Sequence, residues 1–129
     1  MQKRTLTYAG AGHPPLLLRD GASKVVWDVA ENGLFLGRFP FATYSSVELP
    51  LTAGDRALLY TDGIPETTNP AGVEFGTACF KQFLETEQST SADHFADRLL
   101  EELSRWSAQG SDEELDDDIT MVAIHVKSD

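Results

Sequence analysis

Two aspartates stand where apolar segments meet polar loops, and their side chains are the strongest candidates for chemistry. Asp62 follows the apolar residues 58–60 and precedes Gly63, while Asp117 stands just before the apolar run 119–126. If the two segments are antiparallel neighbouring strands, the end of one lies beside the start of the other, and both carboxylates meet at one sheet edge. Oxygen ligands that converge in this way suit Mg²⁺ or Mn²⁺ rather than a soft metal.

Each of these segments also has an ordinary structural interpretation. An Asp-Gly pair after a strand is usually a turn, and an acidic run before a strand is usually a solvated loop. Six of the seven residues in 112–118 are acidic, and packed carboxylates repel one another unless a cation or water relieves them. The pairing of Asp62 with Asp117 across the fold therefore favours a metal site.

Other polar side chains near these positions are weaker candidates. Glu66 follows Asp62 on the same loop and could hold a metal-bound water. His13 could bind phosphate, but the favoured interpretation is that it orders its own loop by hydrogen bonding. Arg56 could meet a substrate phosphate, but surface pairing with one of the many acidic residues is favoured. Gly63 allows a sharp turn and leaves room for a ligand beside the chain.

The elements that must position these residues follow from the hydrophobic periodicity. Apolar or alternating segments predict strands at residues 6–8, 16–18, 24–27, 43–49, 56–61 and 119–126, and an irregular segment at 9–15. Helical spacing predicts helices through residues 79–84 and 95–106, the second capped by Thr90 or Ser91 and stopped at Gly110. Strands followed by helices indicate an α+β fold with helices packed on a mostly antiparallel sheet.

The composition limits the possible functions. The 129 residues have the size of one domain, and 41% are hydrophobic, which is enough for a core. The formal charge of −11 disfavours a nucleic acid partner, because a phosphate backbone would be repelled. No apolar run approaches the roughly 20 residues of a membrane span, and no signal-peptide stretch opens the chain. The single cysteine, Cys79, excludes an intramolecular disulfide and a cysteine-based zinc site, as expected for a cytoplasmic protein.

A set of short motifs occurs in an order that resembles a known family. The motifs are Ala-Gly-Ala-Gly-His-Pro-Pro at 9–15, Leu-Phe-Leu-Gly at 34–37, Gly-Asp at 54–55, Leu-Tyr-Thr-Asp-Gly-Ile-Pro-Glu at 59–66, Phe-Gly at 75–76 and Asp-Asp-Ile-Thr at 117–120. No single motif is very specific, but the ordered set spans nearly the whole chain. Together they resemble the bacterial PPM-type serine/threonine phosphatases of the sporulation stage II E and sigma-factor-regulator branch.

The resemblance implies an antiparallel β-sandwich flanked by helices, with two Mn²⁺ or Mg²⁺ ions at one edge. Asp62 matches the aspartate of the family's Thr-Asp-Gly motif, and Asp117 matches the first aspartate of its Asp-Asp-x-Thr motif. Both are metal ligands there, and the adjacent Gly63 and Asp118 are expected to support them. In the family, the ions activate a bridging water that attacks the phosphorus of a phosphoserine or phosphothreonine, and no phosphoenzyme forms.

One departure from the family pattern concerns the start of the domain. The family's domain begins with further strands that carry an Asp-x-x-Gly-His-Gly-like motif, whose aspartate bridges both metals, and nothing here matches it. His13 belongs instead to a segment that resembles the family's Ala-Gly-His-x-Pro. We therefore expect residues 1–129 to form a single partial domain, the C-terminal portion, either as a fragment or as a naturally short relative.

The missing motif has a consequence for activity. Two divalent ions about 4 Å apart repel strongly unless a carboxylate bridges them. We therefore expect this chain alone to have little or no phosphatase activity.

Two functions compete at this point. The first is a phosphatase domain that acts on a phosphorylated regulatory protein, such as an anti-sigma-factor antagonist. The second is a degenerate phosphatase-like domain that serves as a protein-binding regulatory module. The acidic segment 112–118 favours the first, and the missing motif favours the second if the natural protein begins at Met1.

An incomplete domain also bears on oligomeric state. Strand edges that a missing portion normally covers would be exposed, and exposed edges recruit other chains. We therefore expect self-association, in the form of a homodimer that completes its own sheets.

Overall fold

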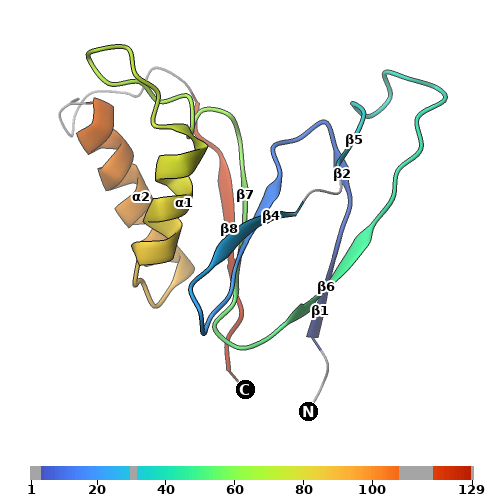
Figure 1. Ribbon diagram of the computed structural model, residues 1–129, viewed down its shortest axis with the longest axis horizontal. Coiled ribbons are helices and arrows are strands. Elements are labelled where there is room, and N and C mark those ends of the chain that lie inside the picture. Colours follow the sequence, from blue (N-terminus) through green and yellow to red (C-terminus); the bar gives the residue numbers. More distant parts are fainter. Residues whose placement is uncertain (1–3, 30–31, 108–117, 129) are drawn as a thin grey trace.

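A four-stranded antiparallel sheet with the order β4-β3-β7-β8 forms the centre of the protein. The computed structural model describes residues 4–29, 32–107 and 118–128. The strands of this sheet are β3 (Leu16–Arg19), β4 (Val26–Val29), β7 (Arg56–Tyr60) and β8 (Met121–His125). Strands β3 and β4 form a hairpin, and β7 brings β3 and β8 together although they are far apart in sequence (Figure 1).

A second sheet lies against one face of the first. It pairs β1 (Arg4–Tyr8) with β6 (Val47–Leu51) in antiparallel register. Alternate residues of both strands pack onto Leu16 and Leu18 of β3 in one apolar cluster. A short parallel pair, β2 (Gly10–Ala11) with β5 (Asn32–Gly33), adjoins this sheet.

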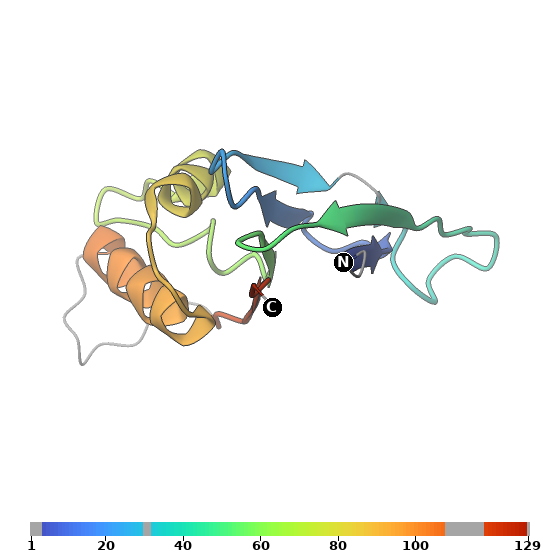
Figure 2. The ribbon, with the colours of Figure 1, turned by 90° about the horizontal axis from the view of Figure 1, so that it is seen from below.

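Two helices, α1 (Gly76–Thr86) and α2 (Ala92–Ser107), cover the other face of the four-stranded sheet (Figures 1 and 2). Because side chains alternate along a strand, Leu17 of β3 points toward the helices while its neighbours point toward β1 and β6. Phe80 of α1 and Leu99 of α2 are fully buried in the resulting core. The described residues thus form three layers: helices, four-stranded sheet and two-stranded sheet.

Most elements expected from the sequence are present. The α+β class and the mostly antiparallel sheets are confirmed, and both predicted helices lie within α1 and α2. Ser91 rather than Thr90 caps α2, since its Oγ accepts a hydrogen bond from the His94 N–H at 3.1 Å. Gly110, the expected helix stop, lies outside the described residues. Neither α1 nor α2, the helices of the described residues, is long and apolar enough to span a bilayer.

Two expected segments differ from the structure. The strand predicted at 43–49 begins later, because pairing with β1 defines β6 as Val47–Leu51. The segment 9–15, expected to be irregular throughout, contains the short strand β2, which pairs with β5.

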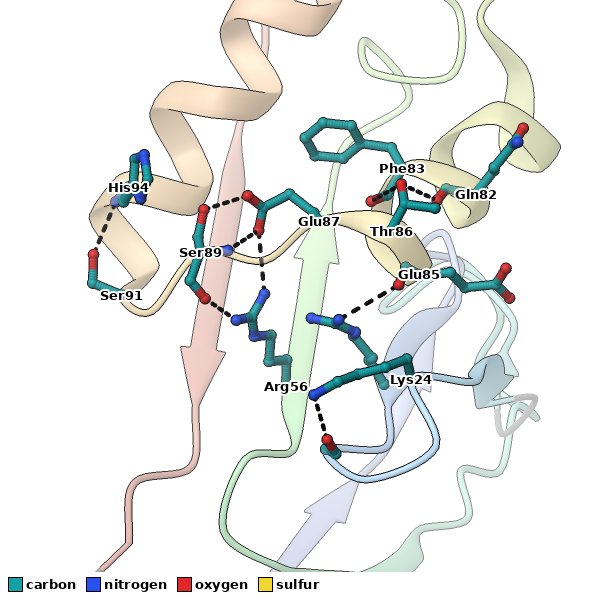
Figure 3. A network of polar contacts seen from close by, with 12 residues as sticks. Lys24, Arg56, Gln82, Phe83, Glu85, Thr86, Glu87, Ser89, Ser91 and His94 are labelled. Carbon is teal, nitrogen blue, oxygen red and sulfur yellow. Dashed lines mark hydrogen bonds and ion pairs between the residues drawn. The ribbon is translucent and has the colours of Figure 1, made fainter.

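A row of basic residues crosses the sheet beneath the helices. Arg19, Arg56 and His125 lie side by side on β3, β7 and β8, and like charges placed directly opposite destabilise a sheet. Glu87, which follows α1, is buried and forms an ion pair with Arg56 at 3.3 Å. Its carboxylate also accepts a hydrogen bond from the Ser89 N–H at 2.8 Å, and Arg56 donates to the Ser89 carbonyl (Figure 3). The buried carboxylate of Glu87 therefore balances charge in this row, in which Arg19 is buried and Arg56 and His125 are partly buried.

The protonation of this cluster depends on burial and on neighbouring charge. Burial lowers the pKa of His125, and the positive charge of Arg56 lowers it further. Burial alone would raise the pKa of Glu87, but hydrogen bonds from Ser89 and the charge of Arg56 together lower it. Both shifts mean that the folded state binds fewer protons than the unfolded state, so acid destabilises the fold.

We predict that the free energy of unfolding falls as the pH drops below about 6.5, the ordinary pKa of histidine, because the unfolded state gains the proton of His125 first. It should fall again below about 4.5, the ordinary pKa of a glutamate, as Glu87 is protonated in the unfolded state. Urea denaturation at a series of pH values measures both steps.

His125→Gln should remove the first step. His94→Gln, which alters an exposed histidine of α2, is the matched control and should retain it. A free energy of unfolding that stays constant from neutral pH to about 5 in the unaltered protein would contradict the assignment.

Candidate metal site

Strands β7 and β8 are antiparallel neighbours, as the candidate site requires. Tyr60 pairs with Met121 at the end of the ladder, and the pairing continues beyond both strands. The Thr61 N–H donates to the Thr120 carbonyl at 3.0 Å, and the Thr120 N–H donates to Thr61 Oγ1 at 3.1 Å. The chain leaving β7 is therefore held beside the chain entering β8.

Gly63 lies directly against this second segment. A Cβ atom at position 63 would lie 2.3 Å from the Asp118 carbonyl oxygen and 3.2 Å from its carbonyl carbon. Only glycine permits so close an approach of two backbones. The space left by the missing side chain, expected to accommodate a ligand, is filled by the Asp118 carbonyl.

Asp62 begins a turn whose backbone is fixed and whose charged side chains are exposed. The Glu66 N–H donates to the Asp62 carbonyl at 3.0 Å, and Thr67 Oγ1 donates to the Gly63 carbonyl at 2.7 Å. Ile64, which is 0% exposed, anchors the turn in the core beneath the helices. Asp62 and Glu66 are both exposed at the surface of this anchored turn.

The structure places some of the predicted site residues together. Asp62, Gly63 and Asp118 lie at one edge of the four-stranded sheet. Asp117 lies outside the described residues, so its role as a ligand stays a prediction. Within residues 4–29, 32–107 and 118–128, no group of three or more His, Cys, Asp or Glu residues is arranged to hold a metal ion.

Neighbouring carboxylates affect the phenol of Tyr60, the last residue of β7. Burial raises the pKa of Tyr60, and the negative charges of Asp28 and Asp62 raise it further. A phenol beside carboxylates holds its proton more tightly because ionisation would add another negative charge. A cation at this edge would relieve the same repulsion.

A cleft of about 550 Å³ opens next to the edge. Residues 7–11 and His13 line one side, and residues 59–61 and 120–122 line the other. The His13 ring is exposed, and its Nδ1 lies 3.1 Å from the Pro14 carbonyl oxygen. This short contact supports the interpretation that His13 orders its own loop.

Arg56 lies at the opposite end of β7 from Asp62. Its pairing with an acidic residue is confirmed, although Glu87 is buried rather than at the surface as expected.

Sequence reasoning gave no role to Thr61 and Thr120, the residues that tie the two segments together. The available signal was their position near strand ends, since Thr61 is the last residue of the strand predicted at 56–61 and Thr120 the second of the one predicted at 119–126.

We predict that Gly63→Ala destabilises the protein by about 2–3 kcal/mol, because the added methyl group forces the Asp118 backbone away from the turn. Gly72→Ala is the matched control, since a Cβ at that position meets nothing within 4 Å and only its φ of +77° opposes the change. That control should cost about 1 kcal/mol. Chemical denaturation measures both, and an equal or smaller loss for Gly63→Ala would refute the close approach.

Comparison with known proteins identifies similar chains. Residues 1–127 match the family model described as stage II sporulation protein E (SpoIIE). Phosphoserine phosphatase RsbU of Bacillus subtilis is 26% identical over 127 residues, which make up 98% of this chain and 36% of RsbU.

Solved structures show the same fold. The phosphatase domain of the cell fate determinant SpoIIE from Bacillus subtilis, presoaked with manganese, has a TM-score of 0.71 and 24% identity, covering 98% of this chain and 52% of that one. The SiaA-PP2C domain of Pseudomonas aeruginosa has a TM-score of 0.74 and 22% identity, covering 94% of this chain and 47% of that one.

The chain thus spans about a third of RsbU and about half of each phosphatase-domain chain. The expected fold, part of a PPM-type sandwich with helices, is confirmed by these structures. Because the family model covers nearly the whole sequence, this chain belongs to the stage II sporulation protein E (SpoIIE) family.

Proposed function

We propose that this chain supplies one side of the active site of a Mn²⁺- or Mg²⁺-dependent protein serine/threonine phosphatase. The observation that carries the proposal is the fixed edge at which the turn of Asp62 and Gly63 abuts the Asp118 backbone. Asp117, the residue before Asp118 in the sequence, is the second proposed ligand. Membership in the SpoIIE family and the similarity to RsbU support the assignment to phosphatases.

The donors at this edge fit a hard divalent cation. Asp62 offers an exposed carboxylate on a rigid turn, and the carbonyl oxygens of the same backbone are also hard ligands. Neither a histidine nor the single cysteine belongs to the turn, which disfavours a soft metal.

In this proposal Asp62 and Asp117 hold the cations, and Gly63 and Asp118 fix the distance between the two ligand segments. Glu66, on the same turn as Asp62, would accept a hydrogen bond from a water in the site. Bound ions would supply the positive charge that lowers the pKa of an attacking water and neutralises charge on the phosphoryl oxygens.

The described residues offer only part of a metal site, since none of their acidic groups forms a cluster of three. The similar phosphatase-domain chains are about twice as long as this one. We propose that residues outside these 129 complete the ligand set, including the carboxylate that would bridge two ions.

The proposed substrate is a phosphoserine or phosphothreonine on a regulatory protein of the anti-sigma-factor antagonist type. RsbU, which is similar over 98% of this chain, is named a phosphoserine phosphatase. An enzyme that acts on a transcription regulator would work in the cytoplasm. A regulatory binding module is the second candidate, favoured by the incomplete ligand set of the described residues.

We predict that the chain binds Mn²⁺ and that Asp62→Asn and Asp117→Asn each weaken binding by at least about tenfold, because each removes a charged ligand. Asp93→Asn is the matched control, since Asp93 is an exposed residue in the first turn of α2. Calorimetric titration measures all four proteins. Titration curves that are the same for the unaltered chain and for both ligand variants would end the metal-site proposal.

We predict that the 129-residue chain with Mn²⁺ hydrolyses a phosphoserine peptide no faster than its Asp62→Asn variant, because the ligand set is incomplete. Release of inorganic phosphate measures the rate. Turnover that depends on Asp62 would show instead that this chain carries a complete site, and would exclude the binding-module alternative.

A further inference from the structure

The basic row formed by Arg19, Arg56 and His125 carries more positive than negative charge. Glu87 forms its ion pair with Arg56, at 3.3 Å. Burial and the charge of Arg56 lower the pKa of His125, so this side chain is neutral near pH 7, whereas both arginines stay charged. Among residues 4–29, 32–107 and 118–128, Arg19 has no carboxylate within ion-pair distance. Two guanidinium groups therefore share one carboxylate.

Arg19 is the most deeply buried member of the row. It is 4% exposed, although an arginine is rarely buried to this extent unless it is paired. Its Nη2 reaches the Glu85 carbonyl only at 3.5 Å, and its buried Nε has no hydrogen-bond partner in the described part of the chain. Burial lowers the pKa of Arg19, and Arg56 lowers it further, while Glu87 offsets part of the change. A negative group in contact with Arg19 would relieve this burial cost.

A small cavity of about 10 Å³ lies beside the row, where the end of α1 and the start of α2 cover the sheet. Arg19, Arg56 and His125 all line it, and Leu84 of α1 and Phe95 of α2 line it on the helix side. A space of this size holds one species about as large as a water molecule. The elements around it, β3, β7, β8, α1 and α2, all belong to the described residues.

Charge and size together select the ligand. The excess of positive charge in the row favours an anion over a cation or a neutral water, because a buried charge is stabilised by a partner of opposite sign. Phosphate, carboxylates and other polyatomic anions are larger than one water molecule, so a monatomic anion suits the cavity better. A charged guanidinium also forms stronger hydrogen bonds to an anion than to a neutral acceptor.

We propose that this cavity binds a chloride ion, with Arg19 Nε as the N–H donor and Arg56 as the second positive charge. The bound ion would stabilise the packing of both helices on the sheet, because elements of both layers line the cavity. The site is independent of the proposed metal site, since Arg56 begins β7 and Asp62 follows its other end.

Urea denaturation of the 129-residue chain tests the proposal in sodium chloride and in sodium gluconate, whose anion is too large for the cavity, at equal ionic strength. The equilibrium constant of unfolding should fall about tenfold when chloride reaches about ten times its dissociation constant. Arg19→Met should lose this chloride dependence, whatever its own stability. Arg38→Met, at an exposed arginine in the loop before β6, is the matched control and should retain it.

Ala123→Val tests the space rather than the charge. Ala123 lines the cavity, and the two added methyl groups would occupy part of it while leaving every charged group in place. This variant should weaken the chloride dependence as Arg19→Met does. Asp62→Asn should keep the dependence, which separates this test from that of the phosphatase proposal.

Chloride NMR gives a second measurement, since chloride that exchanges with a protein site has a broader resonance. The unaltered chain and Arg38→Met should broaden the line, and Arg19→Met should broaden it less. Unfolding that responds to chloride equally in the unaltered chain and in Arg19→Met would overturn the proposal, as would line broadening that Arg19→Met leaves unchanged. General effects of salt act on both proteins alike, so a cavity that holds only water gives the first of these results.

Discussion

The antiparallel ladder between β7 and β8 is the constraint on which the candidate site depends. The ladder aligns the two strands and continues through the mutual hydrogen bonds of Thr61 and Thr120. It ends where Gly63 meets the Asp118 carbonyl, a contact that tolerates no side chain. Two segments nearly 60 residues apart in the chain are thereby fixed at backbone level. Ligands on such segments can be held in position before any cation binds. The conformational entropy lost in ordering them is then lost on folding rather than on binding.

The charged residues at the two ends of β7 differ in whether another side chain balances their charge. At its start, Arg56 belongs to a row of partly or fully buried basic groups, and the buried Glu87 forms an ion pair with it. Removing either partner of a buried pair leaves an uncompensated charge, which costs more than the pair itself contributes. At the other end, Asp62 is exposed, and its charge adds to the rise in the pKa of Tyr60 that burial and Asp28 cause. The ion pair of Arg56 and Glu87 stabilises the fold. The negative charge of Asp62 could instead be balanced by a bound cation.

Periodicity predicted the elements well, because an apolar face must be buried whatever the register. The end of β7 at Tyr60 placed Asp62 at a strand terminus, and both helices followed from their core-facing residues. The register of the strands could not be predicted from periodicity, because it depends on pairing between strands that are distant in sequence. The proximity of Arg19, Arg56 and His125 was missed for this reason, and so was the contact made by Gly63. The bounds of β6 shifted because pairing with β1 outweighed the local preference of its own residues.

The three layers contribute unequally to the stability of the site. The larger apolar core lies between the helices and the four-stranded sheet, and it includes Leu58, Tyr60 and Ile64 from β7 and the turn that follows it. The smaller core faces β1 and β6, and strand β8 extends beyond it with exposed apolar residues on that side. Because hydrophobic stabilisation scales with buried apolar area, the helix-facing core dominates the stability of this chain. The turn that carries Asp62 is anchored in that core through Ile64. These residues can therefore hold the geometry of the turn that carries Asp62.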